Sequence, residues 1–497
     1  MNNNKYHIAK KSYISVIVTG ILSIAISIFG LIVIVFGDEN EKLVITSGLP
    51  LTLIIIGGVV LLILFLIISW ILVNKHVFYD NNDNFIIEKG WLFKRKIAIP
   101  YDKIHSIGLK RNIIDLMLGT TKVEFDTGTT VATGSEGRLP LDKDYALVLK
   151  EFLEKKKDNP NLVLPSPIDK FETINSEKEV FYRATNKNLL KMGILRQPYL
   201  ITVMIMIFYF LIIMYPIIIS DKSNDSTTVF GLLIAMIVAI IVLTIFFAVY
   251  SLIVYYRYEL NIDGDSLEYQ YGLISKTNYK INKKRINAVH LKQSFLYRLF
   301  KKYSLEVSVL GIGDARDNND NKSSTESKYL MPYANLEEVT SILKYLGYEE
   351  VLDNEFIKPK KYRLLNYVVI PGIFISLLHF LPLIFLLDKI AIVYLPTVIT
   401  GIISYFFCIT LLFLRLKNKG YNIKNKFISR TGALSIKTTI INKSKIQSLN
   451  FYQSPIYLIE RLGIINVKYK ELFGTIRLQG YEIEEFEKLK KDIFDFK

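Results

Sequence analysis

The sequence contains few of the residues that build metal centres and catalytic sites. Among its 497 residues there are one cysteine, Cys408, and five histidines. A single cysteine excludes an intrachain disulfide and a thiolate metal cluster. The residue spacings typical of metalloproteases, phosphate-binding loops and nucleophile elbows do not occur. We therefore expect a protein without cofactor, metal or enzymatic activity.

Charge is missing from six long stretches of the chain, which contain no Asp, Glu, Lys or Arg. Each is at least as long as the ~20 residues that cross the hydrocarbon core of a bilayer. Buried helices of soluble proteins rarely run so far without a polar stripe. Because short segments join the members of each pair, we predict six transmembrane helices in three hairpins. The stretches run from Ser12 to Gly37, Leu43 to Asn74, Gln197 to Ser220, Ser226 to Tyr256, Leu364 to Leu387 and Ile390 to Leu414.

The flanking charges predict the orientation of these spans. Lysine and arginine near span ends are retained on the cytoplasmic side, and here they flank the long polar segments, whereas the hairpin tips are mostly acidic. Both termini and all three polar segments should therefore be cytoplasmic. The chain carries a net charge of +16. Because this excess lies next to the spans, we expect anionic lipids of the inner leaflet, rather than nucleic acid, as its partner.

The three polar segments repeat one pattern around a central glycine: Gly90, Gly272 and Gly432. An apolar residue lies five positions before each glycine, and others follow it by fourteen, seventeen and nineteen positions. Three ungapped copies indicate a true internal repeat. The residues at the fourteenth position are Ile104, Ile286 and Ile446. We assign these glycines and isoleucines to the structural motif of the repeat.

Local patterns in each copy predict a small β-rich module with a helical cap. In the first copy, Phe85 to Lys89 and Lys96 to Ile99 form a hairpin around the glycine. A strand at Lys122 to Phe125 follows, and apolar residues from Tyr145 to Phe152 mark a closing helix. We divide the chain into hairpin 12–74, module 75–157, linker 158–196, hairpin 197–256, module 257–348, hairpin 364–414 and module 415–497.

Paired spans, a glycine-centred hairpin, and the dipeptides Gln293-Ser294 and Gln453-Ser454 together resemble the membrane-tethered bacterial pleckstrin-homology domain. Three tandem copies resemble the YdbT-like membrane proteins of Gram-positive bacteria. The first copy departs from the pattern with Arg111-Asn112, and Gly119 and Gly463 are candidates for the glycine expected after this segment. The resemblance implies pleckstrin-like β-sandwiches in the bacterial plasma membrane. It also implies a smaller partner with two spans and one module, and a role in envelope stress and tolerance of membrane-active peptides.

Two basic clusters and one histidine are candidate functional residues. The basic clusters either solvate the modules and fix topology or contact anionic lipid headgroups. Their residues are Lys94, Arg95 and Lys96, and Lys283, Lys284 and Arg285. Each such charge contributes ~1 kcal/mol near an anionic surface. His379 lies inside a predicted span, where an ionisable side chain suggests a function unless it reaches the interface.

The expected role is that of a non-enzymatic membrane scaffold or stress-protection factor that acts with the smaller partner. Two alternatives remain open. A transporter or lipid-translocating protein would have spans that line a path, with His379 facing it. A membrane enzyme acting on lipid or peptide would need a cluster of polar residues at the membrane face.

Overall fold

The computed structural model divides into two compact units. Unit 1 comprises Met1–Glu179, Asn261–Asn282 and Ala315–Asn321, and unit 2 comprises Val180–Leu260, Lys283–Asp314 and Lys322–Lys497. The described residues are 5–15, 17–18, 21, 63–81, 83–104, 106–126, 138–156, 159, 162–166, 180–196, 226–309, 329–348, 355–359, 390–459, 461–469 and 474–494.

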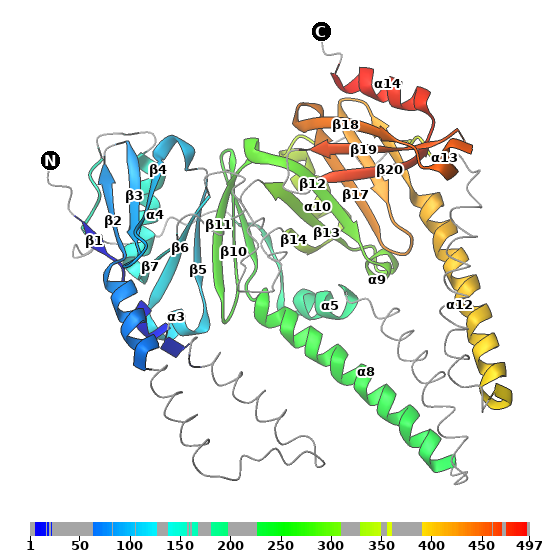
Figure 1. The fold of residues 1–497 in the computed structure, drawn as a ribbon, viewed down its shortest axis with the longest axis horizontal. Coiled ribbons are helices and arrows are strands. Elements are labelled where there is room, and N and C mark those ends of the chain that lie inside the picture. Colours follow the sequence, from blue (N-terminus) through cyan, green and yellow to red (C-terminus); the bar gives the residue numbers. More distant parts are fainter. Residues whose placement is uncertain are drawn as a thin grey trace. The chain divides into compact units, whose positions relative to one another are not determined.

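The first module, in unit 1, is a β-sandwich with a helical cap (Figure 1). One sheet has the strand order β1-β2-β3-β4, and β5, β6 and β7 belong to the other sheet. The strand bounds are β1 Tyr6–His7, β2 Val77–Asn81, β3 Asn84–Lys89, β4 Arg95–Pro100, β5 Ser106–Arg111, β6 Thr120–Asp126 and β7 Arg138–Asp142. A short helix, α3 (Ile113–Leu118), connects β5 to β6, and α4 (Lys143–Lys156) closes the module.

The core of this module is built by both sheets and α4. Phe78 and Phe85 from the first sheet, Val123 and Leu139 from the second, and Leu149 from α4 all have a fully buried side chain. Burial of such a side chain contributes about 1.5–3 kcal/mol. The apolar positions of the repeat pattern in this module all belong to this core: Phe85, Ile104, Ile107 and Leu109.

The second sheet of module 1 continues into module 2. Strand β11 (Lys276–Asn282) pairs antiparallel with β5, and β10 (Ser266–Tyr271) pairs with β11. Within unit 1 the sheet therefore has the order β7-β6-β5-β11-β10. We call the pairing of β5 with β11 junction 1. Gly108 lies opposite Tyr279 in this junction, and the phenol of Tyr279 donates a hydrogen bond to Glu124.

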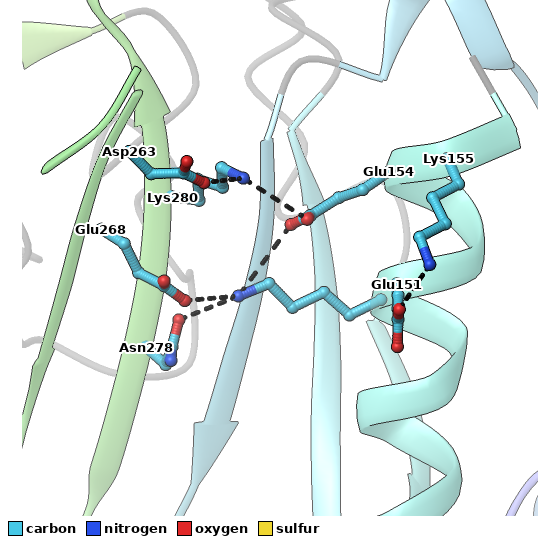
Figure 2. Close-up of polar contacts among 8 residues, drawn as sticks. Glu151, Glu154, Lys155, Asp263, Glu268, Asn278 and Lys280 are labelled. Atoms are coloured by element: carbon cyan, nitrogen blue, oxygen red, sulfur yellow. Dashed lines mark hydrogen bonds and ion pairs between the residues drawn. The ribbon is translucent and has the colours of Figure 1, made fainter. Parts of the chain in front are cut away.

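Charged side chains from α4 reinforce junction 1 (Figure 2). The Nζ atom of Lys150 lies 3.1 Å from Oε1 of Glu268 on β10 and donates to Oδ1 of Asn278 on β11 at 3.0 Å. One helical turn further along, Glu154 lies 3.6 Å from Nζ of Lys280. Lys150 and Glu268 are both buried. Lys150 also lies 4.0 Å from Glu154. Removing Lys150 would take away the cation nearest to the buried Glu268 carboxylate, which is costly for a buried ion pair.

Unit 2 contains the later strands of module 2 and all of module 3. One sheet has the order β14-β13-β12-β17-β16-β15, and a second sheet has the order β18-β19-β20. The strands of module 2 in this unit are β12 Ile286–Gln293, β13 Tyr303–Val309 and β14 Tyr329–Ala334, followed by helix α10 (Leu336–Tyr345). Those of module 3 are β15 Gly420–Ile423, β16 Lys426–Thr431, β17 Ile436–Asn442, β18 Ile446–Tyr452, β19 Gly463–Tyr469 and β20 Thr475–Tyr481, followed by α14 (Ile483–Phe494).

Strands β12 and β17 pair antiparallel and form junction 2 between modules 2 and 3. His290 lies opposite Thr439, and its Nδ1 is 3.1 Å from the threonine hydroxyl. Gly108 and His290 both lie eighteen residues after their module's glycine, and Tyr279 and Thr439 both lie seven residues after theirs. The two junctions therefore have the same register. Ala288 of β12 is also buried in the core of module 3.

Only part of the predicted membrane region lies among the described residues. Within them, one helical segment, Ile237–Val254 of α8 (Ser226–Val254), is long and apolar enough to cross a membrane, with mean hydropathy 3.0. The helix Ile63–Asn74 is apolar but shorter, and α12 (Ile390–Asn418) includes the sixth predicted span. Most of the first and second predicted spans, and all of the third and fifth, lie outside the described residues. The three modules are present, whereas the six-helix arrangement stays a prediction.

The predicted linker 158–196 also contains regular structure. Strand β8 (Val180–Arg183) and helix α5 (Asn186–Arg196) lie in its second half. Helix α5 packs closely on α8, because a Cβ atom at Gly193 would lie 2.5 Å from the carbonyl oxygen of Phe247. The sequence pattern missed this helix because its apolar face is short and broken by charge.

Candidate functional site

The hairpin between β3 and β4 exposes three large apolar side chains. Trp91, Leu92 and Phe93 have exposed fractions of 52%, 74% and 86%. Strand β2 begins just after the apolar helix that ends at Asn74, and Val77 at its start pairs with Glu88 near the hairpin tip. The tip therefore lies at the end of the module where that helix ends, so its apolar side chains would face the bilayer in the predicted topology.

Lys94, Arg95 and Lys96 follow this tip and are exposed. Nζ of Lys96 lies 3.7 Å from Glu88, which also accepts a hydrogen bond from Lys5 at 2.8 Å. Hydrogen bonds from Lys5 and Tyr79 lower the pKa of Glu88, which therefore remains a carboxylate. A basic rim beside exposed aromatic and aliphatic side chains is a pattern typical of membrane-surface contact.

The second predicted cluster occupies a different position in its module. Lys283, Lys284 and Arg285 form a short 3-10 helix directly after β11, at the opposite end of that strand from Gly272. The ring of Tyr345 lies 4.8 Å from Nζ of Lys283. The two predicted basic clusters are therefore not equivalent, and only Lys94 to Lys96 accompany an exposed apolar tip.

A cavity of about 280 Å³ in unit 2 brings together residues from modules 2 and 3. Three cationic side chains line it: Arg196 at the end of α5, Lys292 on β12 and Lys437 on β17. Ser294 and Ser435 add hydroxyl groups. Among the described residues that line this cavity there is no histidine and no carboxylate. The exposed lining is otherwise mostly apolar, so these cations and hydroxyls are the groups that a bound anion would contact.

Tyrosines orient the guanidinium of Arg196. It donates to the phenol oxygens of Tyr329 at 2.6 Å and of Tyr255 at 3.4 Å, and it lies 4.6 Å from the centre of the Tyr329 ring. Burial raises the pKa of Tyr329, so this phenol stays neutral. Close by, Lys292 lies 2.6 Å from Glu306, which offsets part of its charge. Tyr255 directly follows α8 and Arg196 directly precedes the third predicted span, so the cavity belongs to the predicted membrane face.

The central glycines of the repeat allow a sharp turn. Gly90, Gly272 and Gly432 have φ values of 102°, 112° and 133°, and a Cβ atom at any of them would collide with the carbonyl oxygen three residues later. Ile104, Ile286 and Ile446 are buried core residues.

His379 lies outside the described residues, and no group of metal-ligating side chains occurs in the described part of the chain.

The Gln-Ser dipeptide begins a short helix. Ser294 and Ser454 cap α9 (Phe295–Leu299) and α13 (Pro455–Ile459) by accepting hydrogen bonds from backbone N–H groups. The side chains of Gln293 and Gln453 donate to the carbonyl oxygen nine residues later. In the first module Asn112 is the N-cap of α3, and Arg111 donates to the carbonyl of Thr120, also nine residues later. Arg111-Asn112 therefore preserves the structural role, although its sequence departs from the motif.

At the position where the resemblance implies a glycine, the three copies share a left-handed backbone conformation but not a residue type. Gly119, Lys301 and Arg461 lie 29 residues after their central glycines and have φ values of 70°, 51° and 52°. The assignment of Gly463 to this position is wrong, because Gly463 begins β19. There it leaves room for the ring of Phe451.

Comparison with known families agrees with the fold. The family model described as Bacterial PH domain matches residues 15–157, 202–350 and 376–497. The chain therefore belongs to the bacterial PH domain family and contains three tandem copies. The comparisons with curated proteins and with solved structures gave no match.

Sequence reasoning missed the exposed tip of Trp91 to Phe93 and the cavity around Arg196. The first carries a detectable signal, because three large apolar residues between a turn glycine and three cations are out of place in a soluble hairpin. The second has no local signal, since its residues come from α5, α9, β12, β13, β14 and the β16–β17 hairpin.

Proposed function

We propose that the chain is a non-enzymatic integral membrane scaffold, anchored by six spans, that holds three PH-like modules against the inner face of a bacterial plasma membrane. The observation that supports this most directly is the pair of junctions in one register. A repeated strand pairing joins module 1 to part of module 2 in one unit, and module 2 to module 3 in the other. In the proposed topology each module has its own membrane hairpin, and we call the joined modules the platform. Such a platform suits the assembly or positioning of other membrane components better than it suits catalysis.

Anionic lipid is the proposed ligand at the membrane face. The exposed tip of Trp91 to Phe93 and the cations Lys94 to Lys96 support contact with the bilayer surface. The cavity around Arg196 supports binding of one anionic headgroup or a similar phosphate ester. These contacts orient modules that are already tethered, so they add little to membrane affinity itself.

The partner and the biological role are proposed from the family resemblance. A smaller membrane protein with two spans and one PH-like module would bind the platform, and the complex would protect the cell envelope from membrane-active peptides. Transport and lipid translocation are not favoured by any described contact. His379, on which that alternative depended, lies outside the described residues.

Topology is tested first by single-cysteine labelling of the full chain with Cys408 replaced by alanine. Asp38→Cys should react with an impermeant maleimide from outside intact cells, and Asn318→Cys should react only after lysis. Labelling of Asn318→Cys from outside would contradict the cytoplasmic placement of module 2.

The lipid contacts are tested by two measurements. The chain has two tryptophans, Trp70 and Trp91. In Trp70→Phe all tryptophan fluorescence comes from Trp91, and brominated phosphatidylglycerol should quench this fluorescence. In native mass spectrometry, Arg196→Gln should lose a bound anionic lipid that the wild type and Lys284→Gln retain. Equal lipid retention by both variants would contradict headgroup binding at Arg196.

The scaffold role itself is tested in cells that lack the protein and are challenged with a membrane-active peptide. The wild type should restore survival, and a variant with junction 1 disrupted should fail to do so at equal membrane abundance. Full protection by that variant would contradict a role for the platform.

A further inference from the structure

Within the described residues, two strands at sheet ends correspond to the edges that form the chain's own junctions. In junctions 1 and 2, the edges of β5 and β12 receive β11 and β17 from the next module. Strand β18 is the equivalent of β5 and β12 in module 3, and β4 is the equivalent of β11 and β17 in module 1. In the described part of the chain, β18 and β4 each form the end of their sheet.

We propose that β18 of one copy pairs antiparallel with β4 of a second copy, in the register of junctions 1 and 2. Counted from the central glycines, Asn450 occupies the position of Gly108 and His290, and Ile97 occupies the position of Tyr279 and Thr439. Asn450 should therefore lie opposite Ile97 of the second copy. This inference depends on the repeated geometry and goes beyond the proposed scaffold role.

The chemistry of the two edges fits this pairing. Strand β18 contains no charged residue and no proline, two of the usual features that block an exposed edge. Its register shift between Ile446 and Ser448 has an equivalent in β12 between Ile286 and Ala288, and β12 still pairs with β17. Its exposed Tyr452, and next to it Phe451, would lie opposite Arg95 and Lys96. An aromatic ring opposite a cation is a favourable cross-strand pair. The two basic side chains would then face no positive charge on β18.

The alternative of a symmetric contact is less favourable. Two β4 strands paired with each other would bring Arg95 and Lys96 of both copies together, and like charges on adjacent strands are destabilising. Strand β4 also has the stronger edge protection, because it carries these charges and ends at Pro100. A neutral receiving strand such as β18 is therefore the better match.

The geometry indicates that a second copy of the chain is the partner of β18, because the same sequence supplies both strands, β18 and β4, that such a junction needs. Pairing of an incoming strand with an exposed edge is a general mode of recognition. Head-to-tail contacts of this kind leave the same two edges open at the ends of each dimer. They therefore propagate into a line or close into a ring. Each added copy would bring its own membrane hairpins, as each module does within the chain.

Disulfide cross-linking between two tagged copies in isolated membranes tests the register directly. Both copies carry Cys408→Ala. One copy carries Asn450→Cys and the other Ile97→Cys. Directly opposed residues in antiparallel strands lie close enough for a disulfide. The matched control pairs Asn450→Cys with Ala98→Cys, because a shift of one residue directs the side chain to the other face of the sheet.

Mild oxidation should convert the first pair into a mixed-tag species at twice the 57.3 kDa mass of the chain, and the control pair should give none. Equal cross-linking of both pairs, or none by the first, would overturn the proposed register. Cross-linking of Asn450→Cys to itself would show a symmetric contact instead. Capture of a different protein by Asn450→Cys would overturn the second copy as occupant. All four outcomes are independent of the protection assay that tests the scaffold role.

Discussion

Gly108 on β5 lies directly opposite Tyr279 on β11, and its missing side chain leaves the space that the phenol ring occupies. A Cβ atom at position 108 would lie 2.3 Å from Cε1 of Tyr279, far inside van der Waals contact. The same ring reaches β6, where its hydroxyl donates to Glu124. One residue from each of two modules therefore sets how closely their strands approach.

Gly108→Ala should destabilise unit 1 by about 1–3 kcal/mol, because the methyl group overpacks the junction. In a Tyr279→Ala background the same substitution should cost much less, since the ring is gone. Denaturant unfolding of the four proteins in detergent gives the coupling energy between the two sites. Equal costs in both backgrounds would show that the strands do not meet at these residues.

Lys150→Met should destabilise the protein by about 3–5 kcal/mol, because it removes the cation that lies 3.1 Å from the buried carboxylate of Glu268. The matched control is Lys155→Met on the same helix. Lys155 is exposed and lies 2.6 Å from Glu151, one turn away (Figure 2). Such a pair contributes about 0.3–0.5 kcal/mol. Similar losses in thermal unfolding for both variants would contradict the role of Lys150 in junction 1.

His76 should make the stability of module 1 depend on pH. Burial, with a smaller contribution from the charge of Lys89, lowers the pKa of His76 from 6.5 to about 4. The folded state therefore binds fewer protons than the unfolded state between these values, and stability falls as pH decreases from 6.5 towards 4. The loss is about 3 kcal/mol at most. In His76→Phe this part of the pH dependence should disappear, and an unchanged profile would contradict a half-buried imidazole that is neutral in the folded state.

Arg461→Gly should stabilise module 3 by about 0.5–1 kcal/mol, because a left-handed backbone costs a side-chain-bearing residue more than it costs glycine. Arg461 has a φ of 52°. The reverse change, Gly119→Ala, should destabilise module 1 by a similar amount. Nothing lies within 4 Å of a Cβ atom at Gly119, so the effect would come from the backbone alone. A loss of stability in Arg461→Gly, or a gain in Gly119→Ala, in thermal unfolding would contradict the equivalence of these positions.

Much of each module was predictable from the sequence. The hairpin around Gly90, the strand at Lys122 to Phe125 and the closing helix are confirmed as β3, β4, β6 and α4. These elements have strong local signals: a turn glycine, alternation, and apolar residues at helical spacing. Strand β7 and the short helix α3 were missed, because five or six residues carry too little periodicity for a single assignment.

The junctions were not predictable from local patterns. The pairing of β5 with β11 joins residues more than 150 positions apart, and nothing within either strand identifies its partner. The basic clusters show the same limit. Lys94 to Lys96 and Lys283 to Arg285 look alike in sequence, yet the first follows the hairpin tip and the second lies at the far end of a strand. Position along the strand, rather than charge, separates them.

The central claim is that strand pairing joins the sheets of consecutive modules when the protein is in its native membrane. The most direct test replaces Lys110 and Thr277 with cysteine in the full chain that carries Cys408→Ala, because these residues are opposed in junction 1. A protease site placed in residues 167–179 then separates the two halves of the chain. After oxidation of native membranes and cleavage, the fragments should remain joined by a disulfide. When cysteine replaces Leu109 instead of Lys110, the two fragments should separate. Separation in both cases would contradict the account.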